Sequence, residues 1–79
     1  MEVLLAAVSN HLGYALICQH ACGALHHLVK GSKANTGLLI SLGGATAVAK
    51  VRTKWPDNNY VQTEVRKLAN LFVAEMRAW

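Results

Sequence analysis

The sequence predicts an all-α fold of about five short helices within one domain of 79 residues. Apolar residues recur three and four positions apart, which places them on one face of a helix. Glycines and a single proline separate these periodic segments, as expected at helix ends. No segment alternates strictly between polar and apolar residues, so we expect no strands. Because 53% of the residues are apolar and 15% are charged, we do not expect a disordered chain.

Two helices are predicted before residue 31. The first carries an apolar stripe and ends near Gly13; the stripe consists of Met1, Leu4, Leu5, Val8 and Leu12. The second carries a stripe of Tyr14, Ile17, Cys18, Ala21, Leu25 and Leu28. Gly31 is predicted to cap its C-terminus, because glycine adopts the left-handed conformation without a Cβ clash.

The third helix is predicted to be very short, with Asn35 as its N-cap and the Gly43-Gly44 pair at its end. The fourth helix has an apolar face of Ala45, Val48, Val51 and Trp55, and Pro56 ends it. We expect Trp55 to close the corner between the fourth and the last helix.

The last helix is predicted to be the longest. Three residues are candidates for its N-cap: Asp57, Asn58 and Asn59. Its apolar stripe keeps helical spacing to the C-terminus and consists of Val61, Val65, Leu68, Phe72, Met76 and Trp79.

The chain also resembles itself when it is shifted by 43 residues. The shift superposes Ala6 on Ala49, Val8 on Val51, Gln19 on Gln62, Leu25 on Leu68 and Leu28 on Leu71. The hydrophobic phases of the two helix pairs agree as well. A period in the low forties, built from one short and two longer helices, is typical of helical solenoids.

Four segments carry a resemblance to the armadillo repeat family: QHACGALHHLV (19–29), NTGLLISLGGATAVAKV (35–51), KWPDN (54–58) and VQTEVRKLANL (61–71). HEAT repeats share the helix pairing, but the Gly-Gly corner and the three-helix order favour armadillo. The resemblance implies a fragment of a right-handed α-solenoid. It divides the chain into a partial repeat (1–31), a full repeat (32–72) and a C-terminal helix extension (73–79).

The resemblance further implies a non-catalytic scaffold whose third helices line a groove for a protein or an extended peptide. In the family, an Asn holds the peptide backbone and a Trp packs one turn earlier. Asn70 takes the Asn position, whereas His27 replaces it in the earlier copy, and Gly23 and Arg66 stand at the Trp positions. The candidate groove residues are Gln19, Gly23, His27, Gln62, Arg66 and Asn70. The alternative is that these six form only a solvated helix face.

Both ends of such a short solenoid lack polar caps, so we expect self-association, with a dimer favoured. The residues predicted to mediate it are Met1, Leu4, Leu5, Val8, Phe72, Met76 and Trp79. A symmetric dimer would double the number of repeats.

Catalysis is not expected, because the four carboxylates Glu2, Asp57, Glu64 and Glu75 are spread along the chain. No phosphate-binding glycine loop is present, and we predict no cofactor. Cys18, Cys22 and His26 have helical spacing that suits zinc, but one helix does not converge three ligands on one ion. Core cysteines are the favoured interpretation, and no metal is expected. Two cysteines also suggest a reducing compartment, the cytoplasm or alternatively the nucleus.

The main alternative function is a basic helical nucleic-acid-binding domain. The net charge is +4, and the cations that would form a stripe in this interpretation are Lys30, Lys33, Lys50, Arg52, Lys54, Arg66 and Lys67. Against it, residues 45–48 offer only one hydroxyl for reading bases. A third alternative is a piece of a longer repeat protein. No membrane partner is expected, because polar residues interrupt the uncharged stretch 3–29.

Overall fold

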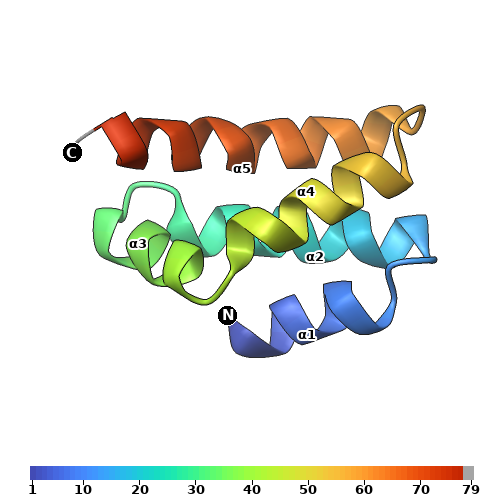
Figure 1. Ribbon diagram of the computed structural model, residues 1–79, viewed down its shortest axis with the longest axis horizontal. Coiled ribbons are helices and arrows are strands. Elements are labelled where there is room, and N and C mark those ends of the chain that lie inside the picture. Colours follow the sequence, from blue (N-terminus) through green and yellow to red (C-terminus); the bar gives the residue numbers. More distant parts are fainter. Residues whose placement is uncertain (78–79) are drawn as a thin grey trace.

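The part of the chain that the structure describes forms five helices and contains no strand, which confirms the all-α prediction. The computed structural model describes residues 1–77, and side chains as far as Glu75. The helices are α1 (Glu2–Asn10), α2 (Ala15–Val29), α3 (Lys33–Ser41), α4 (Gly44–Lys54) and α5 (Asn59–Arg77) (Figure 1). The last helix runs without a break across the predicted repeat boundary at residue 72.

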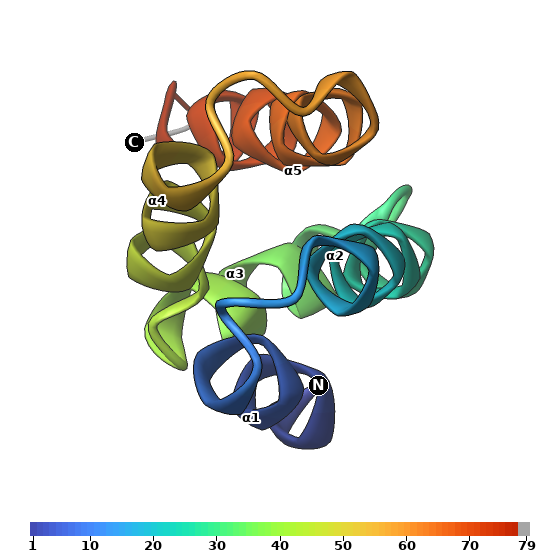
Figure 2. The same ribbon diagram turned by 90° about the vertical axis from the view of Figure 1, so that its right-hand side faces the viewer.

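The helices form two hairpins that lie side by side. One hairpin is α1 with α2, and the other is α4 with α5 (Figure 1). Equivalent helices are neighbours, because α2 packs along α5 and α1 contacts α4. Figure 2 shows α1, α2, α5 and α4 nearly end-on around a common centre. The short helix α3 links the hairpins and contacts α2, α4 and α5.

The 43-residue shift found in the sequence matches this arrangement of helices. Shifting α1 (2–10) by 43 gives 45–53, which lies inside α4 (44–54). Shifting α2 (15–29) gives 58–72, which covers most of α5 (59–77). The internal similarity therefore corresponds to two structurally equivalent hairpins.

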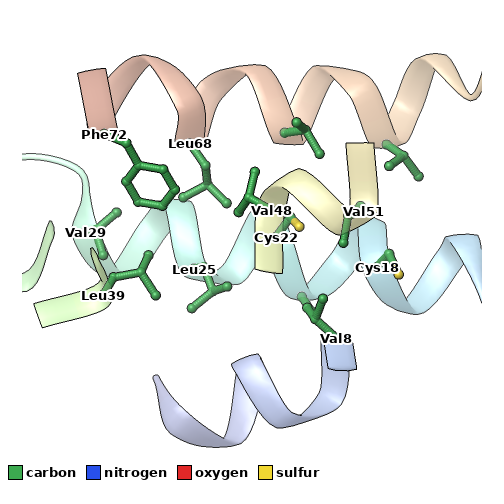
Figure 3. Close-up of a cluster of buried hydrophobic side chains, with 13 residues drawn as sticks. Val8, Cys18, Cys22, Leu25, Val29, Leu39, Val48, Val51, Leu68 and Phe72 are labelled. Carbon is green, nitrogen blue, oxygen red and sulfur yellow. The ribbon is translucent and has the colours of Figure 1, made fainter. Parts of the chain in front are cut away.

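Every helix contributes apolar side chains to one core (Figure 3). Its buried members are Val8, Cys18, Ala21, Cys22, Leu25, Val29, Leu39, Val48, Val51, Val61, Val65, Leu68 and Phe72. Each fully buried Leu or Val removes enough apolar area from water to contribute about 1.5–3 kcal/mol to folding. Cys18 and Cys22 are 0% and 1% exposed, so the prediction of core cysteines is confirmed.

Two glycines hold turn conformations that other residues rarely adopt. Gly31, after α2, has φ 75°, and Gly43, between α3 and α4, has φ 88°. At the next residue, Gly44, close packing leaves no space for a side chain. A Cβ there would lie 2.7 Å from both the backbone oxygen and the Cγ of Leu39. The predicted Gly-Gly corner thus depends on conformation at Gly43 and on close packing at Gly44.

The N-cap of α3 is Ser32, so the prediction of Asn35 was wrong by one turn. The backbone N–H of Asn35 donates to Ser32 Oγ over 3.2 Å, which is the capping bond of a Ser N-cap. The Asn35 side chain instead reaches back to α2, where its Nδ2 donates to the Leu28 carbonyl over 3.0 Å. For α5, Asn58 is the capping residue among the three predicted, because its Oδ1 accepts from the Val61 N–H at 3.1 Å.

Trp55 joins the two hairpins, a contact that the sequence analysis missed. Its backbone carbonyl accepts from Asn58 N–H at the α4–α5 corner, where Trp55 is predicted. Its indole Nε1, however, donates to the carbonyl of Leu12 over 2.9 Å, in the loop between α1 and α2. Leu12 precedes Trp55 by 43 residues, so the bond connects equivalent positions of the two hairpins.

Candidate functional site

The predicted groove helices, α2 and α5, pack along each other, and Gly23 lies where they meet. A Cβ at Gly23 would lie 3.3 Å from Glu64 Oε2. The missing side chain therefore leaves room for a carboxylate of α5. Gly23 is half-buried and offers no side chain to a ligand.

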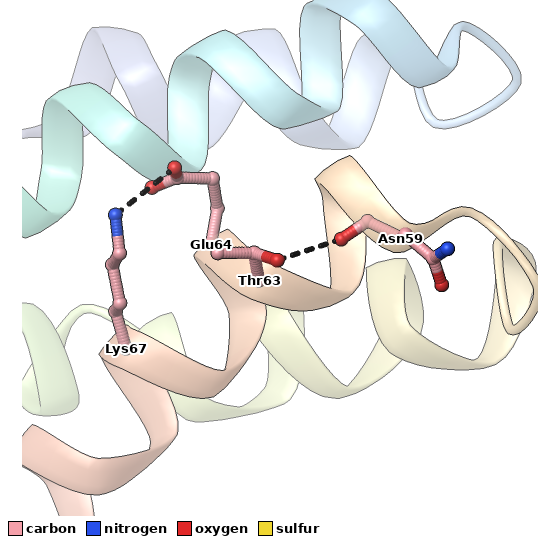
Figure 4. A network of polar contacts seen from close by, with 4 residues as sticks. All are labelled: Asn59, Thr63, Glu64 and Lys67. Carbon is pink, nitrogen blue, oxygen red and sulfur yellow. Dashed lines mark hydrogen bonds and ion pairs between the residues drawn. The ribbon is translucent and has the colours of Figure 1, made fainter.

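Glu64 and Lys67 form an ion pair beside this contact, with Lys67 Nζ 3.4 Å from Glu64 Oε1 (Figure 4). The same stretch of α5 contains a bond from Thr63 Oγ1 to the Asn59 carbonyl at 2.8 Å. An exposed i, i+3 pair contributes about 0–1 kcal/mol. Neither residue was predicted in the groove, and Lys67 was named only as a cation of the alternative nucleic-acid-binding stripe. A Glu and a Lys three residues apart on a helix is a pattern that predicts such an ion pair.

His26 borders the same contact between α2 and α5. Partial burial lowers its pKa, and the positive charges of Lys67, Lys30 and His27 lower it further. Glu64 acts in the opposite direction and raises the pKa of His26. This seam therefore combines imidazole, carboxylate and ammonium groups.

Gln62 serves the junction of α4 and α5. Its Nε2 donates to the carbonyls of Arg52 at 3.2 Å and Trp55 at 2.8 Å. These carbonyls lie at the C-terminal end of α4, where helices leave acceptors without backbone partners. The predicted groove role of Gln62 therefore competes with a capping role that helical spacing does not reveal.

The six predicted groove residues differ in burial and in the helices they lie against. Gln62 and Arg66 line a recess towards α4, and Gly23 faces α5. Gln19 is half-buried on α2, whereas His27 and Asn70 are exposed.

The α4–α5 groove consists of two adjoining recesses. The basic recess has a volume of about 200 Å³ and is lined by Arg52, Gln62, Val65, Arg66 and Ala69. The apolar recess has about 230 Å³ and is lined by Ala45, Val48, Ala49, Arg52, Val65, Ala69, Phe72 and Val73. The two share Arg52, Val65 and Ala69, so they form one continuous groove.

The predicted self-association residues are more deeply placed than their sequence position suggests. Val8 and Phe72 are 2% and 5% exposed and belong to the core, which leaves them almost no free surface. The hairpin packing explains this, because α1 and α5 each turn these side chains inward. Met1, Leu4 and Leu5 are half-buried against the core. The side chains of Met76 and Trp79 lie outside the described residues.

Other apolar side chains are exposed at the α1–α2 end of the molecule. Val3 is 81% and Leu16 is 65% exposed. An open recess of about 330 Å³ lies there, lined by Leu4, Leu16, Ile17, His20 and Ala21. At the other end, Val73 is 47% exposed beside the apolar recess. The sequence does not reveal Val3 and Leu16, because neither lies on the main apolar stripe of its helix.

The buried thiols are unsuited to act as nucleophiles or metal ligands. Burial raises the pKa of Cys18; burial, together with the neighbouring Cys18 and Glu64, raises the pKa of Cys22 to about 12. The thiolate is the reactive form of cysteine, so both thiols are protonated and unreactive near neutral pH. Among the described residues, no three His, Cys, Asp or Glu side chains are grouped to hold a metal ion.

Within residues 1–77 no helix combines the length and the hydropathy needed to cross a bilayer. Comparison of the chain with family models, with curated proteins and with solved structures gave no match.

Proposed function

We propose that the chain is a non-catalytic, armadillo-like interaction module of a right-handed helical solenoid. Its working form is a homo-oligomer, with a dimer favoured, and its partner is a protein or an extended peptide. One observation carries the proposal: two equivalent hairpins, 43 residues apart in sequence, are stacked with α1 beside α4 and α2 beside α5. Stacking of equivalent helices on nearest neighbours is the principle of solenoid proteins.

The order of helices gives further support. The short helix α3 precedes the α4–α5 hairpin and follows a turn with Gly31 at φ 75°. The Gly43-Gly44 corner then leads into α4. A short helix, a glycine corner and two longer helices are the features on which the armadillo resemblance depends.

Self-association is supported by the apolar surface at the α1–α2 end of the stack. Leu16 and Val3 are exposed there, beside an open recess lined by Leu4, Leu16, Ile17, His20 and Ala21. Exposed apolar surface at the ends of a solenoid is normally covered by another repeat.

Sedimentation equilibrium at micromolar and at about tenfold higher concentration tests this proposal. We expect a dimer, and we expect Leu16→Asp to weaken it, because Leu16 is exposed and outside the core. Tyr60→Asp is the matched control, since Tyr60 is 73% exposed at the start of α5, away from this end. A monomer at both concentrations would contradict self-association.

A nucleic-acid-binding domain is the second candidate, and the exposed Lys50, Arg52 and Lys54 of α4 favour it. Lys30 and Lys33, however, lie at the other end of the long axis, beside the α2–α3 turn (Figure 1). Titration of a labelled duplex at two salt concentrations tests this candidate. Tight binding with a steep salt dependence would favour it over the interaction module.

A further inference from the structure

Two arginines at one end of the α4–α5 groove have no ion-pair partner among the described residues. Arg52 comes from α4 and Arg66 from α5, and both line the basic recess. The ion pair that the described residues do form, Glu64 with Lys67, lies at the seam with α2. Two guanidinium groups on facing helices can receive an anion through paired hydrogen bonds, which a carboxylate matches in shape.

The packing of α4 on α5 fixes the position of these arginines. Gln62 donates to the carbonyls of Arg52 and Trp55, so it ties the end of α4 to the first turn of α5. Val65, one turn after Gln62, is buried under the groove. The basic end of the groove therefore stands on ordered helices and not on a loop.

The opposite end of the groove is apolar. Val48, Phe72 and Val73 line it, and Val73 is 47% exposed. Seven residues separate Arg66 from Val73 on α5, as they separate Ala45 from Arg52 on α4. Seven residues of helix span about 10 Å, or two turns. A ligand that fills the groove must carry apolar groups about two helical turns from its anionic group.

We propose that the α4–α5 groove binds an acidic amphipathic helix of a partner protein. Apolar side chains of that helix lie over Val48 and Val73, and its carboxylates meet Arg52 and Arg66. This inference rests on the proposed function, because it names the chemical class of partner that the module recognises. Charge complementarity selects acidic segments, and the apolar end selects against polar anions.

A second copy of this chain that stacks as the two hairpins do would not bring a carboxylate to Arg66. Within the chain, Glu64 of the second hairpin lies against Gly23 of the first. Arg66 is the equivalent of Gly23, 43 residues later, and the equivalent of Glu64 is Ala21, 43 residues earlier. A copy stacked in the same manner would therefore bring Ala21, and no carboxylate, towards Arg66. A partner of different sequence fits the two arginines better.

The test uses the full chain and a synthetic, fluorescently labelled helical peptide of about 15 residues, the length at which isolated helices become stable. The peptide carries Leu side chains one turn apart and Glu side chains about two turns further along. A matched peptide replaces the Glu residues with Gln. Fluorescence anisotropy measures both affinities, and we expect the acidic peptide to bind roughly tenfold or more tightly than the Gln peptide.

Variants of the chain locate the binding. Arg52→Gln with Arg66→Gln is expected to weaken the acidic peptide roughly tenfold to hundredfold, because charged hydrogen bonds are lost. Lys30→Gln with Lys33→Gln removes the same net charge elsewhere and should change affinity less than about twofold. Val73→Glu should weaken binding, whereas Leu38→Glu should not, because Leu38 is equally exposed (48%) but lies on α3, outside the groove. Circular dichroism confirms that each variant is folded.

Equal affinity of the chain for the acidic and the Gln peptide would overturn this inference. It would also be overturned if the lysine double variant lost as much affinity for the acidic peptide as the arginine double variant. Failure of the acidic peptide to bind would also overturn it. Tighter, steeply salt-dependent binding of a nucleic-acid duplex that is lost in the arginine pair would assign the groove to phosphates instead. The proposed function fails by a different measurement, the monomeric mass, so the two failures are distinguishable.

Discussion

The two hairpins are equivalent in position but differ in how their turns are held. In the second hairpin, Asn58 caps α5 and Gln62 closes the end of α4 through two hydrogen bonds. In the first, neither α1 nor α2 has a side-chain cap at its N-terminus. Its loop is held by the Trp55 indole from the second hairpin and by the thiol of Cys18, whose Sγ lies 3.6 Å from the His11 carbonyl. The second hairpin therefore stabilises itself, whereas the first depends on its neighbour.

The largest effect is expected at the corner that introduces the second hairpin. Gly44→Ala places a Cβ 2.7 Å from Leu39 atoms, including a backbone oxygen, and should lower the free energy of unfolding by about 2 kcal/mol or more. Gly37→Ala is the matched control, because nothing lies within 4 Å of its added Cβ in mid-α3. It should stabilise by about 0.5–1 kcal/mol. Urea unfolding measures both, and equal effects would contradict the packing argument.

The dependence of the first hairpin on Trp55 predicts a localised effect. Trp55→Phe removes the bond to the Leu12 carbonyl and should lower the free energy of unfolding by about 1–2 kcal/mol. Amide hydrogen exchange should accelerate in the α1–α2 loop more than in α5. Uniform acceleration along the chain would mean that the first hairpin has no special dependence on this bond.

A smaller effect on stability is expected from substitutions at the N-caps of α5 and α2. Asn58→Ala should cost about 1 kcal/mol, because the Val61 N–H loses its acceptor. Tyr14, the N-cap of α2, makes no side-chain cap bond, so Tyr14→Asn should stabilise by about 0.5–1 kcal/mol. Thermal unfolding of both variants gives the comparison. Destabilisation by Tyr14→Asn would show that the first hairpin needs the tyrosine ring more than a cap.

The smallest effect is a pH dependence at the seam of the hairpins. The pKa of His26 is lowered in the folded state, so the unfolded chain binds this proton more readily. Stability is then fully present above pH 6.5, the ordinary value, and decreases as the pH falls through the lowered pKa. His26→Gln should reduce this decrease in denaturant midpoints between about pH 7 and 5. The His20→Gln variant, on an exposed residue of the same helix that does not contribute to the shift of His26, is the control.

The sequence predicted five helices and their approximate limits, because the spacing of apolar residues and the glycines are local signals. It missed contacts between residues that are far apart in the chain. Trp55 was assigned to the adjacent corner, but its indole binds Leu12 in the other hairpin. Gln62 has a helical phase compatible with a groove, yet its amide is used on α4. Periodicity identifies the face of a helix and does not identify the partner across it.

The candidate site shows the same limit. Arg66 was named from the sequence, but Arg52 was counted only among the positive charges. The two arginines line the same recess only because α4 and α5 pack together, and the sequence does not show this packing. Val8 and Phe72 were expected at the ends of the stack, and the packing of α1 and α5 turned them into the core.

The indole bond of Trp55 also bears on the order of events during protein synthesis. The chain leaves the ribosome from its N-terminus, so the loop at Leu12 emerges 43 residues before its donor. Until then the Leu12 carbonyl lacks its indole donor and α2 lacks its contact with α5. Closing so long a segment has an entropic cost that local hairpin contacts do not have. The first hairpin is therefore made first but completed last, and the nascent chain acquires its stability when the second hairpin arrives.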